Sequence, residues 1–250
     1  MSEQSTLLRQ RDLISRRFGL VPALDVDPFP ELLKVVEATT RVEGVVGYKL
    51  GLAGSLRMGL AKAIAAIREV SDLPIIYDHQ KAGPDMPDMA GKFSSICAEA
   101  GADALILFPV AGPTAVMSFV SESIKRGMAP IVGGHIPVPD YTISGGGFMI
   151  DDVLQRITAV AAKSGARHFV LPANDIGGVE RHVHWAKETV PDFSLFLTGF
   201  GALGGETQPA FSAARGATSC YAIVGRAVCA APKPGEAAKR FIGDIAAAFV

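Results

Sequence analysis

One apolar segment of the sequence, LPIIY, leads directly into a cluster of charged residues. Asp78, Lys81 and Asp85 follow it within the stretch YDHQKAGPDMP. Two earlier apolar segments also end in charge, because GLVPALDV contains Asp25 and GVVGYKL contains Lys49. A single lysine at the end of a strand is usually a solvated charge. Carboxylates and ammonium groups on neighbouring strands would instead lie close together and hold each other ionised, so the pattern indicates a charged site.

A second set of residues has the chemistry of a phosphate site. Gly204 and Gly205, in GFGALGGE, precede a helical segment, where backbone N–H groups can face an anion. Gly225 and Arg226 follow a later apolar run, and a guanidinium matches phosphate oxygens well. These residues predict a phosphorylated substrate.

The charged residues and the phosphate-site residues must be positioned by the elements of the fold. Eight short apolar runs alternate along the chain with segments of helical spacing. Continuous apolar strands between helices indicate a parallel sheet that is covered on both faces. Eight units in 250 residues predict a single-domain (β/α)8 barrel spanning residues 1–250, whose site lies at the carboxyl ends of the strands. A doubly wound sheet is the competing fold. The runs are residues 19–26, 44–50, 73–78, 103–109, 128–134, 167–172, 193–198 and 219–225, and the helical segments include 54–70, 88–101, 115–127, 151–165 and 208–216.

Composition narrows the class of protein. The net charge is −1 and no basic tract occurs, which argues against a nucleic-acid partner. The three cysteines show no metal-ligand spacing, and their odd number fits a reduced compartment. The polar start lacks an apolar signal core, and no run of about 18 apolar residues could cross a membrane. We therefore expect a cytoplasmic protein.

Taken in order, these motifs resemble the orotidine 5′-phosphate decarboxylase family over nearly the whole chain. LDVD is similar to its first-strand acid motif and YKLG to its second-strand lysine motif, while GFGALGGE and IVGRAV resemble its phosphate loops. DHQKAGPD resembles the Asp–Lys–Asp signature of an archaeal-type branch, to which FPVAGP and VGG also fit. The commoner signature, D-x-K-x-x-D, is shorter by one residue in each half.

The resemblance implies decarboxylation of orotidine 5′-phosphate to uridine 5′-phosphate, as in pyrimidine biosynthesis, without cofactor or metal. Lys81 would stabilise the carbanion and protonate it. Asp78, beside the departing carboxylate, would hold Lys81 in place, while Lys49 and Asp25 would balance the charges and bind the ribose. Asp85 would reach into the neighbouring subunit's site, which implies a homodimer with shared active sites.

Two positions depart from the family pattern. Pro137, in GGHIPVP, stands where the branch has a threonine that contacts the pyrimidine, and proline cannot donate a backbone hydrogen bond. Leu203 stands where the family usually has a glutamine that bridges base and phosphate. These departures leave the phosphate and charge motifs intact, but they leave the identity of the base open.

Two alternatives follow. The first is a sister enzyme of the superfamily that acts on a sugar phosphate with Mg²⁺, such as keto-gulonate phosphate decarboxylase or hexulose phosphate synthase. The second is a nucleotide-binding protein without turnover, in view of Pro137 and Leu203.

The histidines and one asparagine carry weaker signals. His182 and His184, in VERHVHW, have a spacing that suggests metal ligands, but we expect them on the polar face of a helix. The roles of His79, His135 and Asn174 stay open at this stage.

Overall fold

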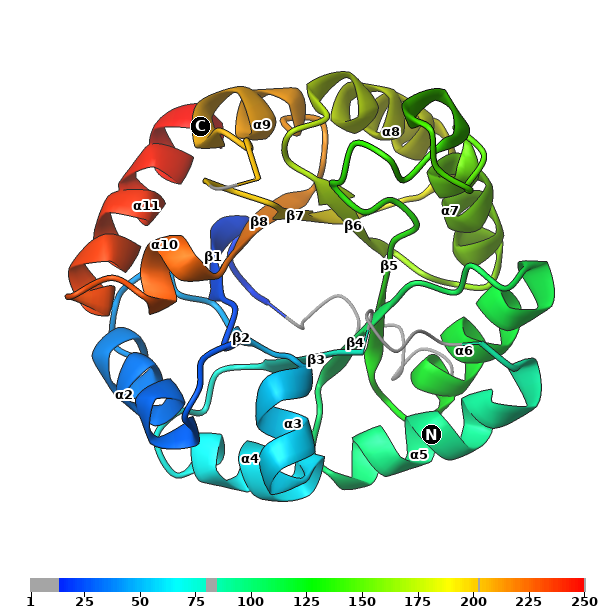
Figure 1. The fold of residues 1–250 in the computed structure, drawn as a ribbon. Helices are drawn as coiled ribbons and strands as arrows, with labels where there is room; N and C mark the ends of the chain where they lie inside the picture. Colours follow the sequence, from blue (N-terminus) through cyan, green and yellow to red (C-terminus); the bar gives the residue numbers. More distant parts are fainter. Residues whose placement is uncertain (1–13, 80–84, 202, 250) are drawn as a thin grey trace.

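Eight parallel strands form a barrel that helices surround (Figure 1). The computed structural model describes residues 14–79, 85–201 and 203–249. Hydrogen-bonded neighbours follow the order β1-β8-β7-β6-β5-β4-β3-β2, and parallel bridges from Leu20 to Val45 and from Ala23 to Lys49 join the β1 and β2 segments. The predicted (β/α)8 barrel is therefore confirmed over the doubly wound sheet. The strands are β1 (Phe18–Pro22), β2 (Tyr48–Leu50), β3 (Ile75–Asp78), β4 (Ala104–Leu107), β5 (Ala129–Val132), β6 (His168–Pro172), β7 (Ser194–Thr198) and β8 (Ser219–Val224).

The strands are apolar on both faces because each face packs against a different part of the core. Side chains such as Ile76, Ile106 and Phe196 form a cluster inside the barrel. Alternate residues, such as Ile75 and Leu105, join a larger cluster with the surrounding helices. This double burial explains the continuous apolar runs of the sequence.

Helices cover the outside of the barrel, and one predicted helical segment is divided. Residues 54–70 contribute to two helices, because Gly59 between them has φ = +78°, which side-chain-bearing residues rarely adopt. No helix in the described ranges is long and apolar enough to cross a membrane. The helices are α2 (Phe29–Thr39), α3 (Leu52–Met58), α4 (Leu60–Arg68), α5 (Ala90–Glu99), α6 (Pro113–Lys125), α7 (Val153–Lys163), α8 (Ile176–Thr189), α9 (Thr207–Ala213), α10 (Arg226–Cys229) and α11 (Pro234–Phe249), with 3₁₀ turns η1 (Pro87–Met89) and η2 (Ile143–Gly145).

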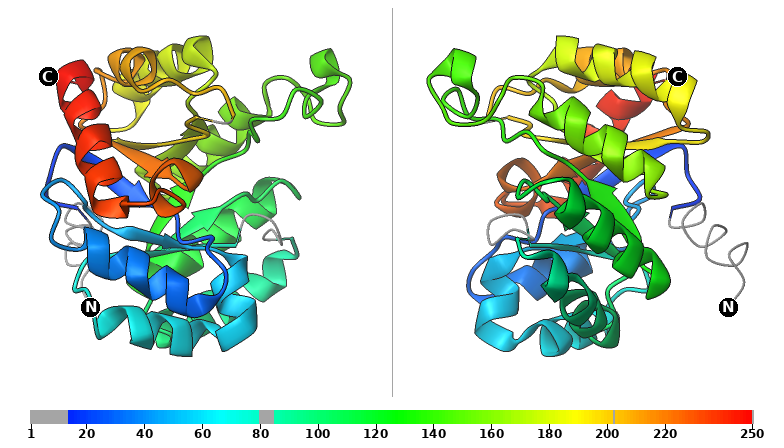
Figure 2. Two further views of the ribbon diagram at one scale, coloured as in Figure 1. Left: turned by 60° about the vertical axis from the view of Figure 1, so that its left-hand side comes forward. Right: turned by 90° about the vertical axis from the view of Figure 1, so that its right-hand side faces the viewer.

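The segment between β5 and α7, residues 133–152, projects from the barrel, and we call it the arm (Figure 2). Its own hydrogen bonds shape it. The Tyr141 hydroxyl donates to the Gly134 carbonyl at 2.8 Å, and the Ile143 N–H donates to the Met149 carbonyl at 2.7 Å. The arm is thus folded back on itself at the end of β5.

The prediction that His182 and His184 share a polar helix face is wrong. Both lie on α8, but His182 is only 2% exposed and packs against the rings of Phe169 and Trp185. His184 is exposed. Residues two apart on a helix point in widely different directions, so the pair cannot share one face.

Candidate active site

The carboxyl ends of β1, β2 and β3 bring three charged side chains together. Lys49 Nζ donates to Asp25 Oδ2 and to Asp78 Oδ2, each at 2.8 Å. Lys49 is 6% exposed and Asp78 is 4% exposed, whereas Asp25 is partly open to solvent. We call these three residues the charged cluster. Adjacent strands position it, since Lys49 is paired with Ile76 of β3 and bridged to Ala23 after β1.

The glycine of the YKLG motif makes room for this cluster. A Cβ atom at Gly51 would lie 1.9 Å from Asp25 Oδ1 and 3.4 Å from Lys49 Nζ. Any other residue at this position would displace the Asp25 carboxylate. Gly51 is therefore part of the geometry of the site.

Lys49 is held in its charged form. Burial alone lowers the pKa of a lysine, but the charges of Asp78 and Asp25 and their hydrogen bonds outweigh it, so the pKa of Lys49 is raised. Two carboxylates and one ammonium leave the charged cluster with a net charge of −1. The cluster therefore favours a further cation nearby.

The remaining residues of the β3 signature make other contacts or lie outside the described residues. Lys81 is outside them. Asp85 is exposed, and its Oδ1 accepts the N–H of Met86 at 2.5 Å. His79 points to the helix side, where its Nδ1 lies 2.6 Å from the Tyr77 hydroxyl and its ring lies 5.0 Å from that of Phe93. Burial lowers the pKa of His79.

A cavity of about 420 Å³ lies at the ends of β7 and β8, where a phosphate site is predicted. We call it the β7–β8 cavity. Arg226 lines it and is exposed, so its guanidinium is available to an anion. Gly204 N–H donates to the Gly201 carbonyl at 2.8 Å and Gly205 N–H to the Gly199 carbonyl at 3.1 Å. These two predicted phosphate donors are thus engaged within their own loop. The lining residues are Gly199, Phe200, Leu203, Ile223, Gly225, Arg226 and Ala227.

The two departures from the family pattern lie close together. A Cβ built on Gly199 would be 3.5 Å from Pro137 Cγ and 3.6 Å from Leu203 Cβ. Gly199 has φ = +87°, so the backbone itself favours glycine here. Residues from the arm and from the loop after β7 therefore form one apolar wall.

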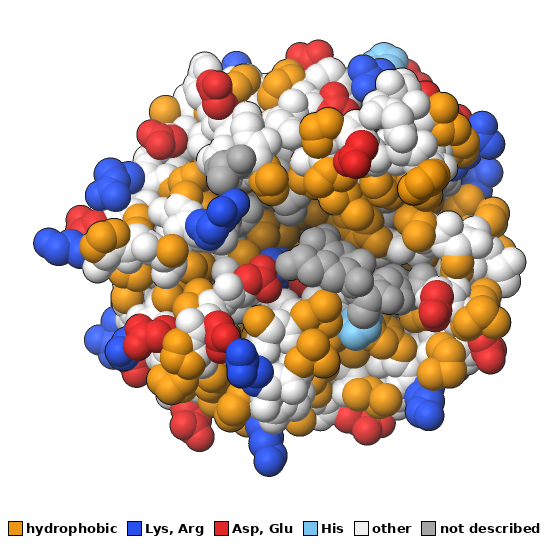
Figure 3. All heavy atoms as spheres, in the orientation of Figure 1, with side chains coloured by type: hydrophobic (Ala, Val, Ile, Leu, Met, Phe, Trp, Pro, Cys, Tyr) orange, Lys and Arg blue, Asp and Glu red, His pale blue; other side chains and the backbone are white. Residues whose placement is uncertain are grey.

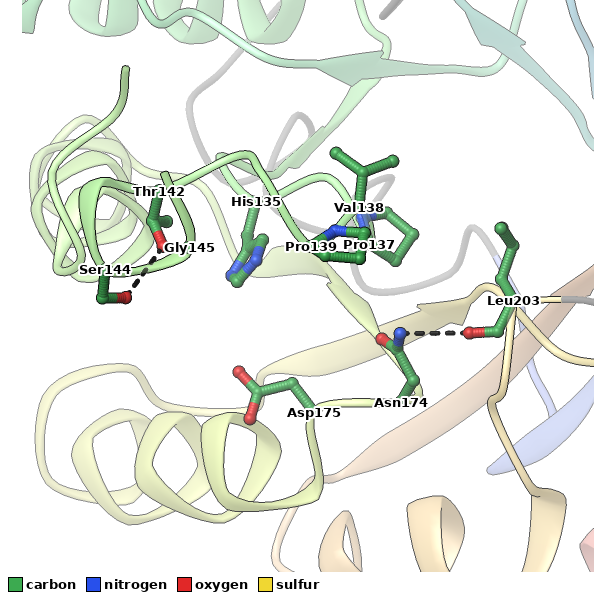
Figure 4. Close-up of a pocket in the computed structure, with 10 residues that line it drawn as sticks. All are labelled: His135, Pro137, Val138, Pro139, Thr142, Ser144, Gly145, Asn174, Asp175 and Leu203. Carbon is green, nitrogen blue, oxygen red and sulfur yellow. Dashed lines mark hydrogen bonds between the residues drawn. The ribbon is translucent and has the colours of Figure 1, made fainter. Parts of the chain in front are cut away.

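Beyond this wall lies a second cavity, of about 560 Å³, which we call the arm cavity (Figure 4). The amide of Asn174 lines it and donates from Nδ2 to the Leu203 carbonyl at 3.1 Å. Our sequence reasoning missed Thr142 and Ser144, which also line it, as does Asp175. The length of the segment between β5 and α7 was the signal available, because long loops in compact domains are often functional. The lining residues are His135, Pro137, Val138, Pro139, Thr142, Ser144, Gly145, Asn174, Asp175 and Leu203.

The face with the strand ends is charged at its centre. Figure 3 shows acidic and basic side chains in the central hollow, with hydrophobic side chains around it. Within the described part of the chain, no three His, Cys, Asp or Glu side chains are grouped as a metal ion requires. Asp25 and Asp78 instead share the ammonium group of Lys49.

Sequence comparisons identify relatives over almost the whole chain. The family model described as Orotidine 5′-phosphate decarboxylase / HUMPS family matches residues 19–241. Orotidine 5′-phosphate decarboxylase from Methanosarcina barkeri is 30% identical over 239 residues, which cover 94% of this chain and 98% of the relative. The enzyme of the same name from Methanosarcina acetivorans is 28% identical, with 94% and 97% covered.

Solved structures of the same name share the fold. The orotidine 5′-monophosphate decarboxylase of Methanocaldococcus jannaschii superposes with a TM-score of 0.77 at 22% identity, covering 92% of this chain and 99% of that chain. The Pyrococcus horikoshii enzyme gives 0.71 at 24% identity, with 91% and 99% covered. The relatives bear the name of a carboxy-lyase, and this confirms the prediction of an enzyme of that type. The chain belongs to the orotidine 5′-phosphate decarboxylase / HUMPS family.

Proposed function

We propose that this protein decarboxylates orotidine 5′-phosphate to uridine 5′-phosphate without a metal or an organic cofactor. The observation that carries the proposal is the charged cluster of Asp25, Lys49 and Asp78 at the carboxyl ends of three adjacent strands, in which Lys49 and Asp78 are buried. The names of the relatives agree with this reaction.

The reaction needs a positive charge and a proton at one carbon of the pyrimidine. The bond to the carboxylate breaks, carbon dioxide leaves, and the electron pair stays on the ring carbon until a proton arrives. A nearby ammonium group stabilises that charge as it develops and then supplies the proton. Lys49 is poorly suited to donate, because its pKa is raised and two carboxylates bind it.

Lys81 is therefore the proton donor that we propose. It follows Asp78 by three residues in the chain, and the net charge of −1 on the charged cluster favours a further ammonium beside it. Asp78 would hold Lys81 close to the departing carboxylate, and Asp25 would bind the ribose. Carboxylates and ammonium groups would then alternate, and each would keep the other ionised.

The phosphate of the substrate would bind in the β7–β8 cavity. Arg226 supplies a charged fork there, and Gly225 leaves the adjacent backbone accessible. Because Gly204 and Gly205 donate within their loop, their N–H groups would reach a phosphate only after that loop changes its hydrogen bonds. Arg226 would therefore make the main contact with the phosphate.

We also propose a homodimer in which the face with the strand ends is buried. The described residues include 13 exposed large hydrophobic side chains. Ile96 and Met117 lie on the outer helices α5 and α6, and the other 11 lie in the first segment after the carboxyl end of a strand. Phe148 of the arm is 98% exposed. Apolar side chains gathered on one face are typical of a protein–protein contact. Asp85, exposed on the same side, would then be able to enter the partner's site.

A nucleotide-binding protein without turnover is the second candidate, because the side chains of Pro137 and Leu203 offer no hydrogen bond to a base. Turnover of orotidine 5′-phosphate by the wild-type protein separates the two candidates, and the role of Lys81 is tested by the Lys81→Ala variant. We expect its turnover of orotidine 5′-phosphate to fall by several orders of magnitude, since the carbanion loses both its stabilising charge and its proton source. Its affinity for uridine 5′-phosphate should change much less. A variant that keeps more than about a tenth of wild-type turnover would remove Lys81 from this role.

A further inference from the structure

The two side chains of the apolar wall cannot form hydrogen bonds, so a ligand that contacts the wall must find its hydrogen-bond partners among the other residues that line the arm cavity. Pro137 and Leu203, which flank Gly199, line the arm cavity and carry no side-chain hydrogen-bonding group. Asn174 lines the same cavity, and its bond to the Leu203 carbonyl orients the amide. With Nδ2 facing Leu203, the carbonyl oxygen Oδ1 is left on the other side of the amide, as Figure 4 shows. A ligand at the wall would thus meet a hydrogen-bond acceptor.

The arm cavity is unsuited to an anion. Neither lysine nor arginine lines it in the described part of the chain. Asp175 caps helix α8, accepting the N–H of Gly178 at 2.8 Å, so a carboxylate already occupies the helix end that would attract an anion. The cavity therefore favours a neutral or cationic group that carries hydrogen-bond donors.

The arm cavity and the β7–β8 cavity share Leu203. They have opposite preferences, since Arg226 lines the second cavity and favours an anion. A volume of about 560 Å³ lies within the range of small-molecule sites. One ligand could therefore place a phosphate near Arg226 and a donor-bearing ring edge near Asn174.

We propose that Asn174 is a specificity-determining residue, whose Oδ1 accepts an N–H from the base of the phosphorylated ligand at the edge of the arm cavity. This inference rests on the proposed function, because it takes the phosphate to bind near Arg226. The ligand class is a 5′-phosphorylated nucleotide whose base carries an imide or amide N–H, as uracil does at N3.

Calorimetric affinities of three ligands test the inference. Uridine 5′-phosphate carries the donor, 3-methyluridine 5′-phosphate has it blocked, and ribose 5-phosphate has no base. Wild-type protein should bind the first about fivefold more tightly than the second, in line with one neutral hydrogen bond. Asn174→Ala should lose that preference and still bind ribose 5-phosphate to within about twofold of wild type. Arg226→Ala should weaken all three ligands.

Glu180→Gln is the matched control. Glu180 is exposed on α8 and lines neither cavity, so the preference for uridine 5′-phosphate should persist. An equal loss for all three ligands in Asn174→Ala would overturn the inference and leave the proposed function standing, because Asn174 would then only support the loop at Leu203. Wild-type protein that binds none of the three would overturn both.

Discussion

At the residue scale, Lys49 shows how the barrel keeps charge in a buried place. Its ammonium lies 2.8 Å from a carboxylate on each side, and its side chain is almost fully covered. Removing two opposite charges from water costs several kcal/mol for each ion, and close pairing offsets that cost. Removing one partner alone leaves the others uncompensated.

Lys49→Met should therefore lower the free energy of unfolding by about 3 kcal/mol at neutral pH, because the buried Asp78 carboxylate loses an ammonium partner. Urea titration of wild type and variant measures this change. Lys62→Met is the matched control, since Lys62 is exposed on α4 and should cost well under 1 kcal/mol. Equal costs for the two variants would mean that the charged cluster adds no stability.

At the element scale, the strands were predictable and the segment joining β5 to α7 was not. Strands buried on both faces appear as uninterrupted apolar runs, and all eight were located in this way. The division of residues 54–70 depends on the positive φ of Gly59, which composition alone does not reveal. The arm is held by its own hydrogen bonds and not by a helix or strand of the barrel, so its sequence shows no apolar periodicity.

A buried histidine on α8 leads to a prediction about how the stability of the protein depends on pH. Burial lowers the pKa of His182 from 6.5 to about 3. The unfolded chain therefore binds more protons than the folded chain between these values, and stability that is present above pH 6.5 is lost as the pH falls toward 3. From pH 7 to pH 5 this residue alone should lower the free energy of unfolding by about 2 kcal/mol.

His182→Leu should remove that part of the pH dependence, because leucine does not titrate. Urea titrations at pH 7 and pH 5 measure it, and His184→Leu on the same helix is the control, since His184 is exposed. If His182→Leu and wild type lose the same free energy between the two pH values, the buried histidine does not contribute as described.

At the scale of the whole molecule, the charged cluster and most of the exposed large hydrophobic side chains of the described residues lie in segments at or after the carboxyl ends of the strands. The charged cluster lies at the strand ends, and exposed hydrophobic side chains such as Leu56, Met86 and Phe148 lie in segments on the same side. A two-fold dimer through this face would cover the apolar surface and bring each Asp85 toward the partner's site.

The shared site can be tested by mixing two inactive variants. Lys81→Ala and Asp85→Ala homodimers should each be nearly inactive. After they are unfolded and refolded together, about half of the dimers contain one of each chain, and one of the two sites in such a dimer is intact. Activity should therefore recover to about a quarter of wild type. Asp88→Ala, at a nearby exposed acid, should stay active by itself. No recovery, with dimers confirmed by light scattering, would mean that Asp85 does not serve the partner's site.

Sequence reasoning located the charged cluster better than it located the apolar wall of Pro137 and Leu203. Asp25, Lys49 and Asp78 lie at or just beyond the carboxyl ends of recognisable strands, and adjacent strands bring them together. Pro137 and Leu203, which both lie near Gly199, come from two loops more than 60 residues apart, and no local sequence pattern predicts that they flank the same glycine. For the same reason the sequence does not reveal that the Asn174 amide donates to the Leu203 carbonyl.

The most direct test of the account is the conversion of orotidine 5′-phosphate by the wild-type protein in the presence of a chelator such as EDTA. The loss of substrate is followed by absorbance, and the product is identified by chromatography. We predict stoichiometric formation of uridine 5′-phosphate at a rate that the chelator does not change. A rate that the chelator abolishes and Mg²⁺ restores would contradict the metal-free mechanism. Binding of the nucleotide with no product at all would contradict the enzyme itself.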